Sequence, residues 1–334
     1  VKHFCVDIAR DRGWVQAAGG NVSWKTKSEL WIKASGTWLA DAQKKPIFVP
    51  VDRAILKDAL TRRDYSFNSR ALDAYGLRPS IETMMHALMP QQIVVHLHLV
   101  DAVALLVRRK SNAEIASALG NDFVWSLIGY HTPGADLARA IHAQVLLNPS
   151  TQLVFLKNHG VIVAADTVEE VYEVLRELSK CLELVPRNIV TTATSAWFNS
   201  QASTLSDSGY KPCKDPYLNQ LVLVPDLYQR LKDSWAICPD HVVFLGATAA
   251  CLDNLDDLPD YLQTLELATP FIFVKGKGIL QALDVKPTQV AQLTFYLDVI
   301  LRQPIENRIV CLKPDEVYSL LDWDSEKYRQ SFVR

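Results

Sequence analysis

The sequence predicts an α/β protein in which helices flank a sheet, followed by a second, smaller α/β domain. The first observation is that strand-type and helix-type patterns alternate along residues 3–185. The second is that 334 residues, 49% of them apolar, are enough for two domains with cores of their own. The third is a run of small polar residues and turn formers at 187–216, which is typical of a domain boundary.

The elements of the first domain follow from apolar spacing and from capping residues. Asp52, Ser80 and Thr167 are expected N-caps, and a glutamate three positions after Thr167 completes a capping-box pattern. In chain order we predict a helix over 3–11, strands over 22–25 and 30–36, helices over 52–63 and 80–89, a strand over 93–100, a helix over 136–147, two strands with a tight turn over 153–165, and a helix over 167–185.

The second domain is predicted to be α/β as well. We place the first domain at 1–190, a linker at 191–216 and the C-terminal domain at 217–334. Within the C-terminal domain we predict helical structure over 217–235, a strand over 241–246, two strands over 270–280, a helix over 287–304 and a last helix near the C-terminus.

The charge balance excludes some classes of partner. Lys and Arg total 35 against 37 Asp and Glu, a net charge of −2, so the sequence carries no electrostatic footprint for nucleic acid or for an anionic membrane. No apolar run reaches transmembrane length. Six scattered cysteines without a CxxC pair predict reduced thiols in a cytoplasmic protein. A small polar molecule is the expected partner.

Two histidines stand one residue apart in the apolar run IVVHLHLV. In a strand, residues i and i+2 point to the same face about 6.6 Å apart, whereas on a helix they would diverge. His96 and His98 therefore converge only if the run is a strand. His159, in the turn KNHG, is a candidate third ligand for zinc or another divalent metal. The alternative is that these histidines are buried, hydrogen-bonded core residues.

Three imidazoles would leave a metal with an open position, as catalytic zinc sites do. Glu82, in the first turn of the helix before the histidine strand, is the candidate acid or base. The alternative is that it only complements the helix dipole. Polar turns at 19–23 and 34–37, the second following Lys33, are candidate anion sites, and Ser80 adds a helix N-terminus. Taken singly, each turn is also compatible with an ordinary hairpin.

The motifs GGNVSWK, IKASGT, RPSIET, VVHLH, GYHTPG and LKNHGVIV occur in the order and approximate spacing of the class II aldolase/adducin family, which the chain resembles over about residues 5–185. AGGNVSWK is most similar to the aldolase part of rhamnulose phosphate aldolase/dehydrogenase proteins, although no GxGxxG follows. The resemblance implies a three-layer α/β/α sandwich with a mixed, mainly antiparallel sheet, a Zn²⁺ cofactor, a sugar phosphate substrate and a homo-oligomer.

The resemblance also implies roles for single residues. It implies that His96, His98 and His159 are zinc ligands and that Glu82 is the acid/base, although the segment from Glu82 to His96 is shorter than in fuculose phosphate aldolases. Tyr130 corresponds to a tyrosine that some members donate across a subunit boundary. The phosphate-binding turns are implied to contain Asn21, Ser35, Gly36 and Ser80, with Lys33 and Thr37 beside them.

Three functions are compatible with these residues. The first is a metal-dependent aldolase that cleaves a phosphorylated ketose by retro-aldol chemistry. The second is a sugar-phosphate epimerase or isomerase that uses the same site. The third is a non-catalytic, adducin-like assembly module, which has no physical need for three histidines and a glutamate.

The C-terminal domain contains a segment similar to one in the first domain. Residues 273–284 align without gaps to 155–166, with five identities in twelve positions, and 241–246 overlay 93–98. In this overlay Phe244, Gly246 and Lys277 replace the three histidines. We hypothesise that the second domain is a degenerate, metal-free relative of the first. Coincidence between two apolar hairpins is the alternative.

Overall fold

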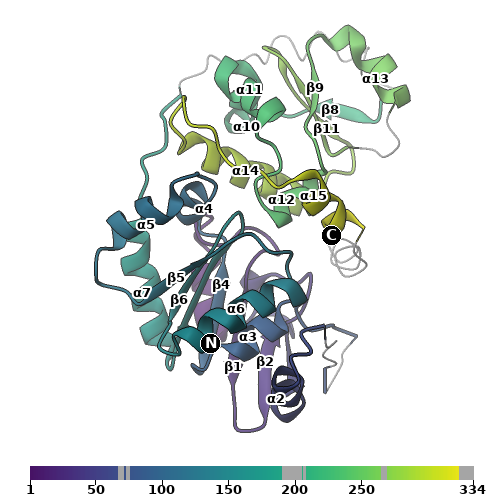
Figure 1. Ribbon diagram of the computed structural model, residues 1–334. Coiled ribbons are helices and arrows are strands. Elements are labelled where there is room, and N and C mark those ends of the chain that lie inside the picture. The colour runs from purple at the N-terminus through teal and green to yellow at the C-terminus, as the bar shows by residue number, and fades with distance from the viewer. Residues whose placement is uncertain (67–70, 73–75, 190–204, 206–207, 265–268, 323–334) are drawn as a thin grey trace. The chain divides into compact units, whose positions relative to one another are not determined.

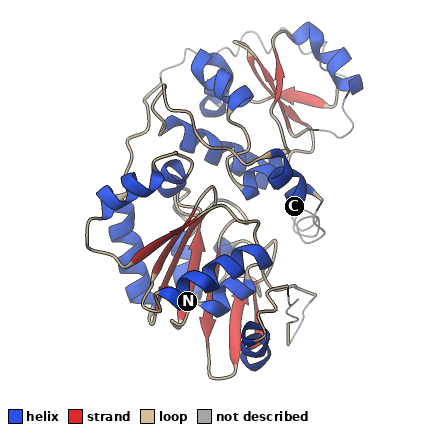
Figure 2. Cartoon of the chain, viewed as in Figure 1, coloured by secondary structure: helices blue, strands red, loops and turns tan. Residues whose placement is uncertain are grey.

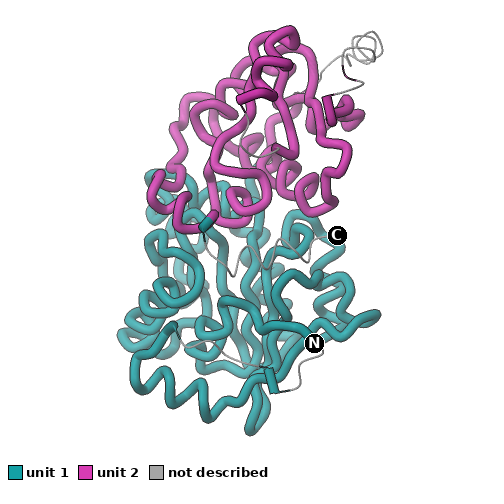
Figure 3. The backbone as a smooth tube through the Cα atoms, turned by 90° about the vertical axis from the view of Figure 1, so that its right-hand side faces the viewer, with its two compact units in different colours: residues 1–184, 322–333 teal, residues 185–321, 334 magenta. Residues whose placement is uncertain are grey.

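The computed structural model describes residues 1–66, 71–72, 76–189, 205, 208–264 and 269–322. The chain divides into two compact units, unit 1 with residues 1–184 and unit 2 with residues 185–321 (Figure 3). No helix among the described residues is long and apolar enough to cross a membrane.

Unit 1 is built on one large sheet. Its elements are α1 (Lys2–Ile8), β1 (Asn21–Lys25), β2 (Glu29–Lys33), the 3-10 helix η1 (Leu39–Asp41), β3 (Phe48–Asp52), α2 (Arg53–Thr61), α3 (Thr83–Leu88), β4 (Ile93–Leu97), α4 (Val100–Leu106), α5 (Ser111–Leu119), β5 (Trp125–Ile128), α6 (Ala135–Leu147), β6 (Leu153–Leu156), β7 (Gly160–Ala165) and α7 (Val168–Cys181) (Figure 1). In the described residues the strand order is β3-β2-β1-β4-β7-β6-β5. All neighbouring strands in that order are antiparallel except β5 and β6.

Helices cover both faces of this sheet, and strand alternation divides the core between them. In β4, the side chains of Val95 and Leu97 belong to the core that includes residues of α1, α4, α5 and α7. Val94 belongs to the opposite core, with residues of α2, α3 and α6. Figure 1 shows α3 and α6 side by side on the same face of the sheet. The prediction of a three-layer α/β/α sandwich with a mixed, mainly antiparallel sheet is therefore confirmed.

Unit 2 has a smaller sheet and a set of short helices (Figure 2). Its elements are β8 (Tyr210–Pro212), α10 (Pro216–Leu223), α11 (Pro225–Asp233), α12 (Pro239–Leu245), β9 (Ala250–Leu252), η2 (Leu255–Asp257), α13 (Leu258–Thr264), β10 (Phe271–Val274), β11 (Gly278–Ala282), α14 (Pro287–Leu301) and α15 (Pro314–Leu321). The strand order among described residues is β8-β11-β10-β9. The predicted smaller C-terminal α/β domain is thus present as an α/β unit.

Several local predictions are corrected. The run at 241–246, predicted as a strand, is helix α12, because Pro239 at the first helical position pre-sets the helix and Gly246, with φ of 92°, ends it. The predicted helix over 80–89 begins later, since α3 starts at Thr83 and Ser80 does not cap it. Strand β3 was not predicted, because its residues were assigned to the approach to helix α2.

Other predictions agree with the structure. Asp52 caps α2 by accepting hydrogen bonds from the backbone N–H groups of Ala54 and Ile55. Thr167 and Glu170 form the predicted capping box of α7. The segment predicted as a linker, 191–216, lies partly outside the described residues, and its described end contains strand β8 of unit 2.

Candidate metal centre and its glutamate

Strand β4 and the β6–β7 turn bring three histidines together. His96 lies on β4 and His98 directly after it, on the same face, and the pairing of Leu97 with Val161 places the turn that holds His159 beside them. The Nε2 atoms of His98 and His96 are 3.2 Å apart, and those of His96 and His159 are 3.3 Å apart. All three side chains are buried. The strand prediction for this run is confirmed by β4.

The donor set fits a divalent metal ion. Zinc–nitrogen bonds of roughly 2.0–2.1 Å place the nitrogens of a tetrahedral site about 3.3 Å apart, which matches the separations here. The Nδ1 atom of His96 lies 3.0 Å from the carbonyl oxygen of Val161. Because a carbonyl can only accept, Nδ1 carries the proton and Nε2 presents its lone pair to the cluster. Among the described residues, these histidines form the group that could hold a metal.

Two glycines allow the backbone to close around the histidines. A Cβ atom at Gly160 would lie 2.4 Å from the carbonyl oxygen of Leu97 and 2.9 Å from the His98 ring. A Cβ atom at Gly20 would lie 2.8 Å from the carbonyl oxygen of His96, and its φ of 66° is one that residues other than glycine rarely adopt. Both positions need glycine because the end of β4, where His96 and His98 lie, passes directly over them.

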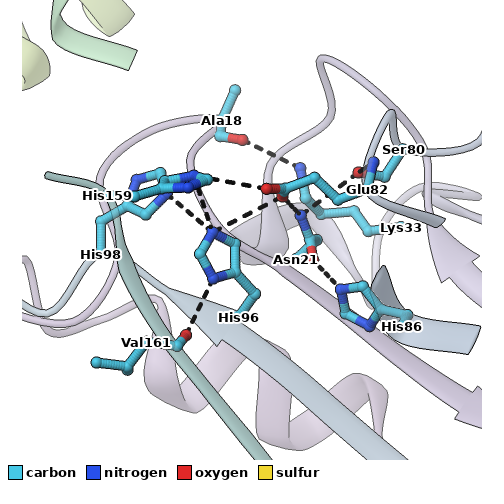
Figure 4. A network of polar contacts seen from close by, with 10 residues as sticks. All are labelled: Ala18, Asn21, Lys33, Ser80, Glu82, His86, His96, His98, His159 and Val161. Atoms are coloured by element: carbon cyan, nitrogen blue, oxygen red, sulfur yellow. Dashed lines mark hydrogen bonds and ion pairs between the residues drawn. The ribbon is translucent and has the colours of Figure 1, made fainter. Parts of the chain in front are cut away.

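Glu82 lies beside the histidine cluster (Figure 4). Its two carboxylate oxygens are 3.7 Å from Nε2 of His96 and 3.5 Å from Nε2 of His159. The side chain is buried, and the amide of Asn21 donates a hydrogen bond of 2.7 Å to its Oε2 atom. The carboxylate therefore reaches the metal-binding nitrogens even though the segment from Glu82 to His96 is short.

Ser80 has a different local role from the predicted helix cap. Its Oγ atom accepts a hydrogen bond of 3.2 Å from the backbone N–H of Glu82. Glu82 itself occupies the N-cap position of α3. The turn that Ser80 forms thus sets the backbone of Glu82 before the helix begins.

The segments that carry the predicted phosphate-binding residues lie together beside Glu82. The backbone N–H of Ser80 donates to the carbonyl of Lys33, and the N–H of Ser35 donates to the carbonyl of Arg78. The amide of Asn21 also lies 3.4 Å from Oγ of Ser80. Tertiary structure has therefore gathered Asn21, Lys33, Ser35 and Ser80.

Internal contacts account for the shape of the 34–37 loop. The Lys33 ammonium, buried in the protein, donates to the carbonyls of Ala18 and Thr37. The hydroxyl of Thr37 donates to the carbonyl of Ala34, and Gly36 takes a positive φ of 76°. Lys33 therefore ties the loop before β1 to the loop after β2.

Tyr130 lies in the segment that follows β5, the strand at the edge of the sheet. The carbonyl of Ile128, at the end of β5, accepts a hydrogen bond of 3.0 Å from the backbone N–H of Lys157, two residues before His159. The neighbouring His131 contacts Asp136, with 3.0 Å between Nδ1 and Oδ2.

Sequence reasoning missed His86 and Ser23. His86 is fully buried in α3, with one ring nitrogen against Oδ1 of Asn21 and the other 2.7 Å from Oγ of Ser23. Burial lowers the pKa of His86 well below its ordinary value. Its spacing of four residues from Glu82 was the available signal, because such residues lie on one helix face.

Comparison with known proteins agrees with this geometry. The family model described as "Class II Aldolase and Adducin N-terminal domain" matches residues 3–185. A protein of Bacillus subtilis (strain 168), named "Uncharacterized oxidoreductase YuxG", is 31% identical over 184 residues, which is 50% of this chain and 26% of that protein. The chain thus matches about a quarter of that relative's length.

Two solved structures are similar to about half of this chain. The N-terminal class II aldolase domain of a conserved Thermoplasma acidophilum protein is 24% identical, with a TM-score of 0.46, over 55% of this chain and 90% of that one. A sugar-phosphate aldolase from Thermotoga maritima is 15% identical, with a TM-score of 0.43, over 54% and 89%. Since the family model covers more than half of the sequence, the chain belongs to the class II aldolase and adducin family.

Proposed function

We propose that this protein is a metal-dependent carbon–carbon lyase that cleaves a phosphorylated ketose by retro-aldol chemistry. The observation that carries the proposal is the convergence of three buried imidazole nitrogens with the carboxylate of Glu82 on one side of them. An assembly module would have no physical need for this arrangement, which places a candidate acid/base next to a metal-binding set.

His96, His98 and His159 would hold the metal, and Zn²⁺ is the ion that we propose. When bound, the metal supplies Lewis acidity towards the oxygens of the substrate and stabilises the negative charge that develops as the carbon–carbon bond breaks. In the cleavage direction Glu82, as the carboxylate, would take the proton of the substrate hydroxyl whose oxygen becomes the aldehyde oxygen, and would return it to the carbon that is left with the electron pair. In the condensing direction it would remove a proton from that carbon and return it to the new hydroxyl.

The phosphate end of the substrate is proposed to lie at the loops beside Glu82. The hydroxyls of Ser35 and Ser80 and the backbone N–H of Gly36 would donate to the phosphate, with Thr37 beside them, and Lys33 would add a positive charge. Asn21 contacts both Ser80 and Glu82, so it would link the phosphate loop to the reacting end of the site.

Metal content is the first test. Elemental analysis of the purified protein is expected to give about one zinc per chain, and a His96→Ala, His98→Ala double variant is expected to lose it, because three ligands become one. Tyr65→Phe/His142→Ala, which alters a hydrogen-bonded tyrosine–histidine pair of the same unit, is the control. A wild-type protein that takes up no zinc at neutral pH would rule out this function and favour an assembly role.

Activity is the second test. Phosphorylated ketoses are incubated with the zinc-loaded protein, and release of an aldehyde is measured. Glu82→Gln is expected to keep its zinc and to lose about 10²–10⁴-fold in kcat, as loss of general acid–base catalysis predicts. Glu173→Gln, an exposed residue of α7, is the matched control. An epimeric sugar phosphate as the only product would assign the site to an epimerase.

The homo-oligomer and the role of Tyr130 rest on the family resemblance. Tyr130 follows β5, the strand at the edge of the sheet. We propose a homo-oligomer in which Tyr130 faces the cluster of another chain. Mixing a Tyr130→Phe variant with a Glu82→Gln variant tests this, because mixed oligomers would regain active sites that neither parent has. No regained activity in verified mixed oligomers would contradict it.

A further inference from the structure

A continuous chain of buried polar contacts runs from strand β1 to the carboxylate of Glu82. Ser23 contacts Nδ1 of His86 at 2.7 Å. Nε2 of His86 contacts Oδ1 of Asn21, and the Asn21 amide nitrogen lies 2.7 Å from Oε2 of Glu82 (Figure 4). Asn21 and Ser23 lie on one face of β1, and Asn21 pairs with His96 on β4. The four side chains are at most 6% exposed.

The chemistry of the four side chains fixes which group donates and which accepts in each of these hydrogen bonds. A carboxylate can only accept, so Asn21 must present its NH₂ group to Glu82 and its carbonyl oxygen to His86. The opposite amide orientation would place an oxygen against the carboxylate, which is repulsive. His86 must then donate from Nε2, and its Nδ1 atom accepts from the hydroxyl of Ser23.

We propose that His86 and Ser23 are positioning residues that hold Glu82 through Asn21, and the proposal rests on the function proposed above. Ser23 satisfies Nδ1 of His86, His86 donates from Nε2 to the Asn21 carbonyl and so orients the amide, and that amide holds Oε2 of Glu82 while Oε1 faces His159. These contacts keep the Glu82 carboxylate in one orientation.

Variants of His86 separate positioning from mere packing. His86→Leu fills the space but cannot donate to Asn21, whereas His86→Gln places an amide donor near the position of Nε2. His86→Leu is expected to lose about 10–100-fold in kcat with a smaller change in KM, as for a displaced catalytic group. His86→Gln is expected to regain most of the loss.

Nitrogen-15 NMR of the zinc-free protein tests the tautomer without any activity. We expect the His86 ring to be protonated at Nε2, because the Asn21 carbonyl oxygen can only accept. A ring protonated at Nδ1 in the wild-type protein would overturn the proposal. So would a His86→Leu enzyme with the wild-type kcat. If the protein cleaves no sugar phosphate, the proposed function fails, while the tautomer of His86 still decides the contact chain.

A separate observation concerns unit 2, whose sheet repeats half of the unit 1 sheet. The four strands β4 to β7 lie in the order β4-β7-β6-β5, and the four strands β8 to β11 lie in the order β8-β11-β10-β9. In both sets the first two neighbouring pairs are antiparallel and the last is parallel. A helix follows the last strand in each, α7 and α14. The match thus extends beyond a single hairpin.

Residue registers agree within the two hairpins. In unit 1, Leu156 pairs with Gly160, and in unit 2, Val274 pairs with Gly278. Each residue of the second pair stands 118 positions after its counterpart in the first. The turn residues Asn158 and Gly276, related by the same shift, both have positive φ, of 52° and 63°. An unrelated pair of hairpins has no reason to share both strand register and turn conformation.

Three backbone hydrogen bonds of unit 1 have a counterpart of nearly equal length in unit 2. In each case the donor is named first and the acceptor second. The pairs are Lys157–Ile128 (3.0 Å) with Lys275–Leu252 (2.9 Å), His159–Leu156 with Lys277–Val274 (both 3.1 Å), and Ala164–Gln152 (2.9 Å) with Ala282–Pro270 (3.0 Å). The first pair extends the match to the parallel strands β5 and β9.

The structure also corrects which residues replace the histidines. Because 241–246 form helix α12, they cannot be equivalent to β4, so Phe244 and Gly246 replace no ligand. Strand β8 takes that place. His96 pairs with Ile162 on β7, and Pro212 pairs with Leu280, the residue 118 positions later on β11. Pro212 is therefore equivalent to His96.

We infer that unit 2 contains a repeat of about residues 93–181 in which the metal ligands are lost. Pro212 and Lys214 stand for His96 and His98, and Lys277 stands for His159. Neither proline nor an ammonium group offers a lone pair to zinc. Unit 2 would thus be a structural relative of the metal-binding unit without a metal of its own.

Restoring histidines tests the repeat. In a His96→Ala, His98→Ala background without zinc, the change Pro212→His/Lys214→His/Lys277→His is expected to restore about one zinc per chain, because the repeat predicts converging rings. The control, Lys211→His/Cys213→His/Lys277→His, places two histidines on the opposite face of β8 and should bind none.

Two results would overturn the inference of a metal-free repeat. One is a folded test variant, judged by its circular dichroism, that binds no more zinc than the control. The other is measured on the wild-type protein and needs no engineered fold: two zinc ions per chain, one of which survives in the His96→Ala, His98→Ala variant, would show that unit 2 holds a metal site after all.

Discussion

Replacing Gly160 by alanine tests whether the close approach of β7 to β4 sets the metal geometry. A Cβ atom there would lie 2.4 Å from the carbonyl oxygen of Leu97, while ordinary contacts begin at 3.4 Å, so the strands must separate by about 1 Å. The same atom would lie 2.9 Å from the His98 ring and 3.2 Å from the His96 ring. The strain therefore falls on two of the three ligands.

The magnitude follows from these distances. Overpacking of a buried position costs about 1–3 kcal/mol of unfolding free energy. Since the ligand nitrogens are 3.2–3.3 Å apart, a displacement of about 1 Å takes them out of tetrahedral spacing, and we expect zinc affinity to fall about 10–100-fold. Gly160→Ala should thus weaken metal binding more than a simple loss of stability would.

The assay is zinc titration against a competing chelator, with urea unfolding of the zinc-free protein measured alongside. Gly129→Ala is the control, because a Cβ at that position would meet no heavy atom within 4 Å. A Gly160→Ala protein that binds zinc as tightly as the wild-type protein would refute the reasoning. Equal zinc loss in both glycine variants would refute it as well, because the effect would then not depend on the close contact.

Two further predictions concern stability. Burial lowers the pKa of Lys25 to about 7, whereas an unfolded lysine titrates near 10.4, so between these pH values the unfolded state binds more protons and the unfolding free energy rises with pH. In urea unfolding, Lys25→Met should flatten this rise with pH and raise the unfolding free energy at pH 7. An unchanged pH dependence would contradict the lowered pKa of Lys25. Thr167→Ala, which removes the capping box of α7, should lower the unfolding free energy by about 1 kcal/mol, and a variant as stable as the wild-type protein would show that the cap is not needed.

Local periodicity explains which parts of the fold were predictable. The strand period of two is sufficient to place His96 and His98 on one face, and Thr167 with Glu170 marks the start of α7. The same reasoning failed at 241–246, because a short apolar run fits strand and helix alike. Pro239 and Gly246 were the signals that could have decided it.

The residues of the candidate site were predicted more fully than the contacts between them. The histidines and Glu82 were named from residue type and family resemblance, and the structure brings them together. The contact from Asn21 to Glu82 spans 61 positions, and that from Ser23 to His86 spans 63. No local pattern records contacts of that separation, which is why His86 and Ser23 were missed.

By itself, the sequence determined the alternation of helices and strands, the two-domain organisation that we predicted and the histidine pair on one strand face, because these depend on periods of a few residues. Only the tertiary structure decided that β7 pairs with β4, that His159 meets His96 and that Asn21 holds Glu82. It also decided that β8, rather than the run at 241–246, is the strand equivalent to β4. The physical reason is that strand pairing and buried hydrogen bonds join residues far apart in the chain, and the free energy that selects them comes from the whole packed core.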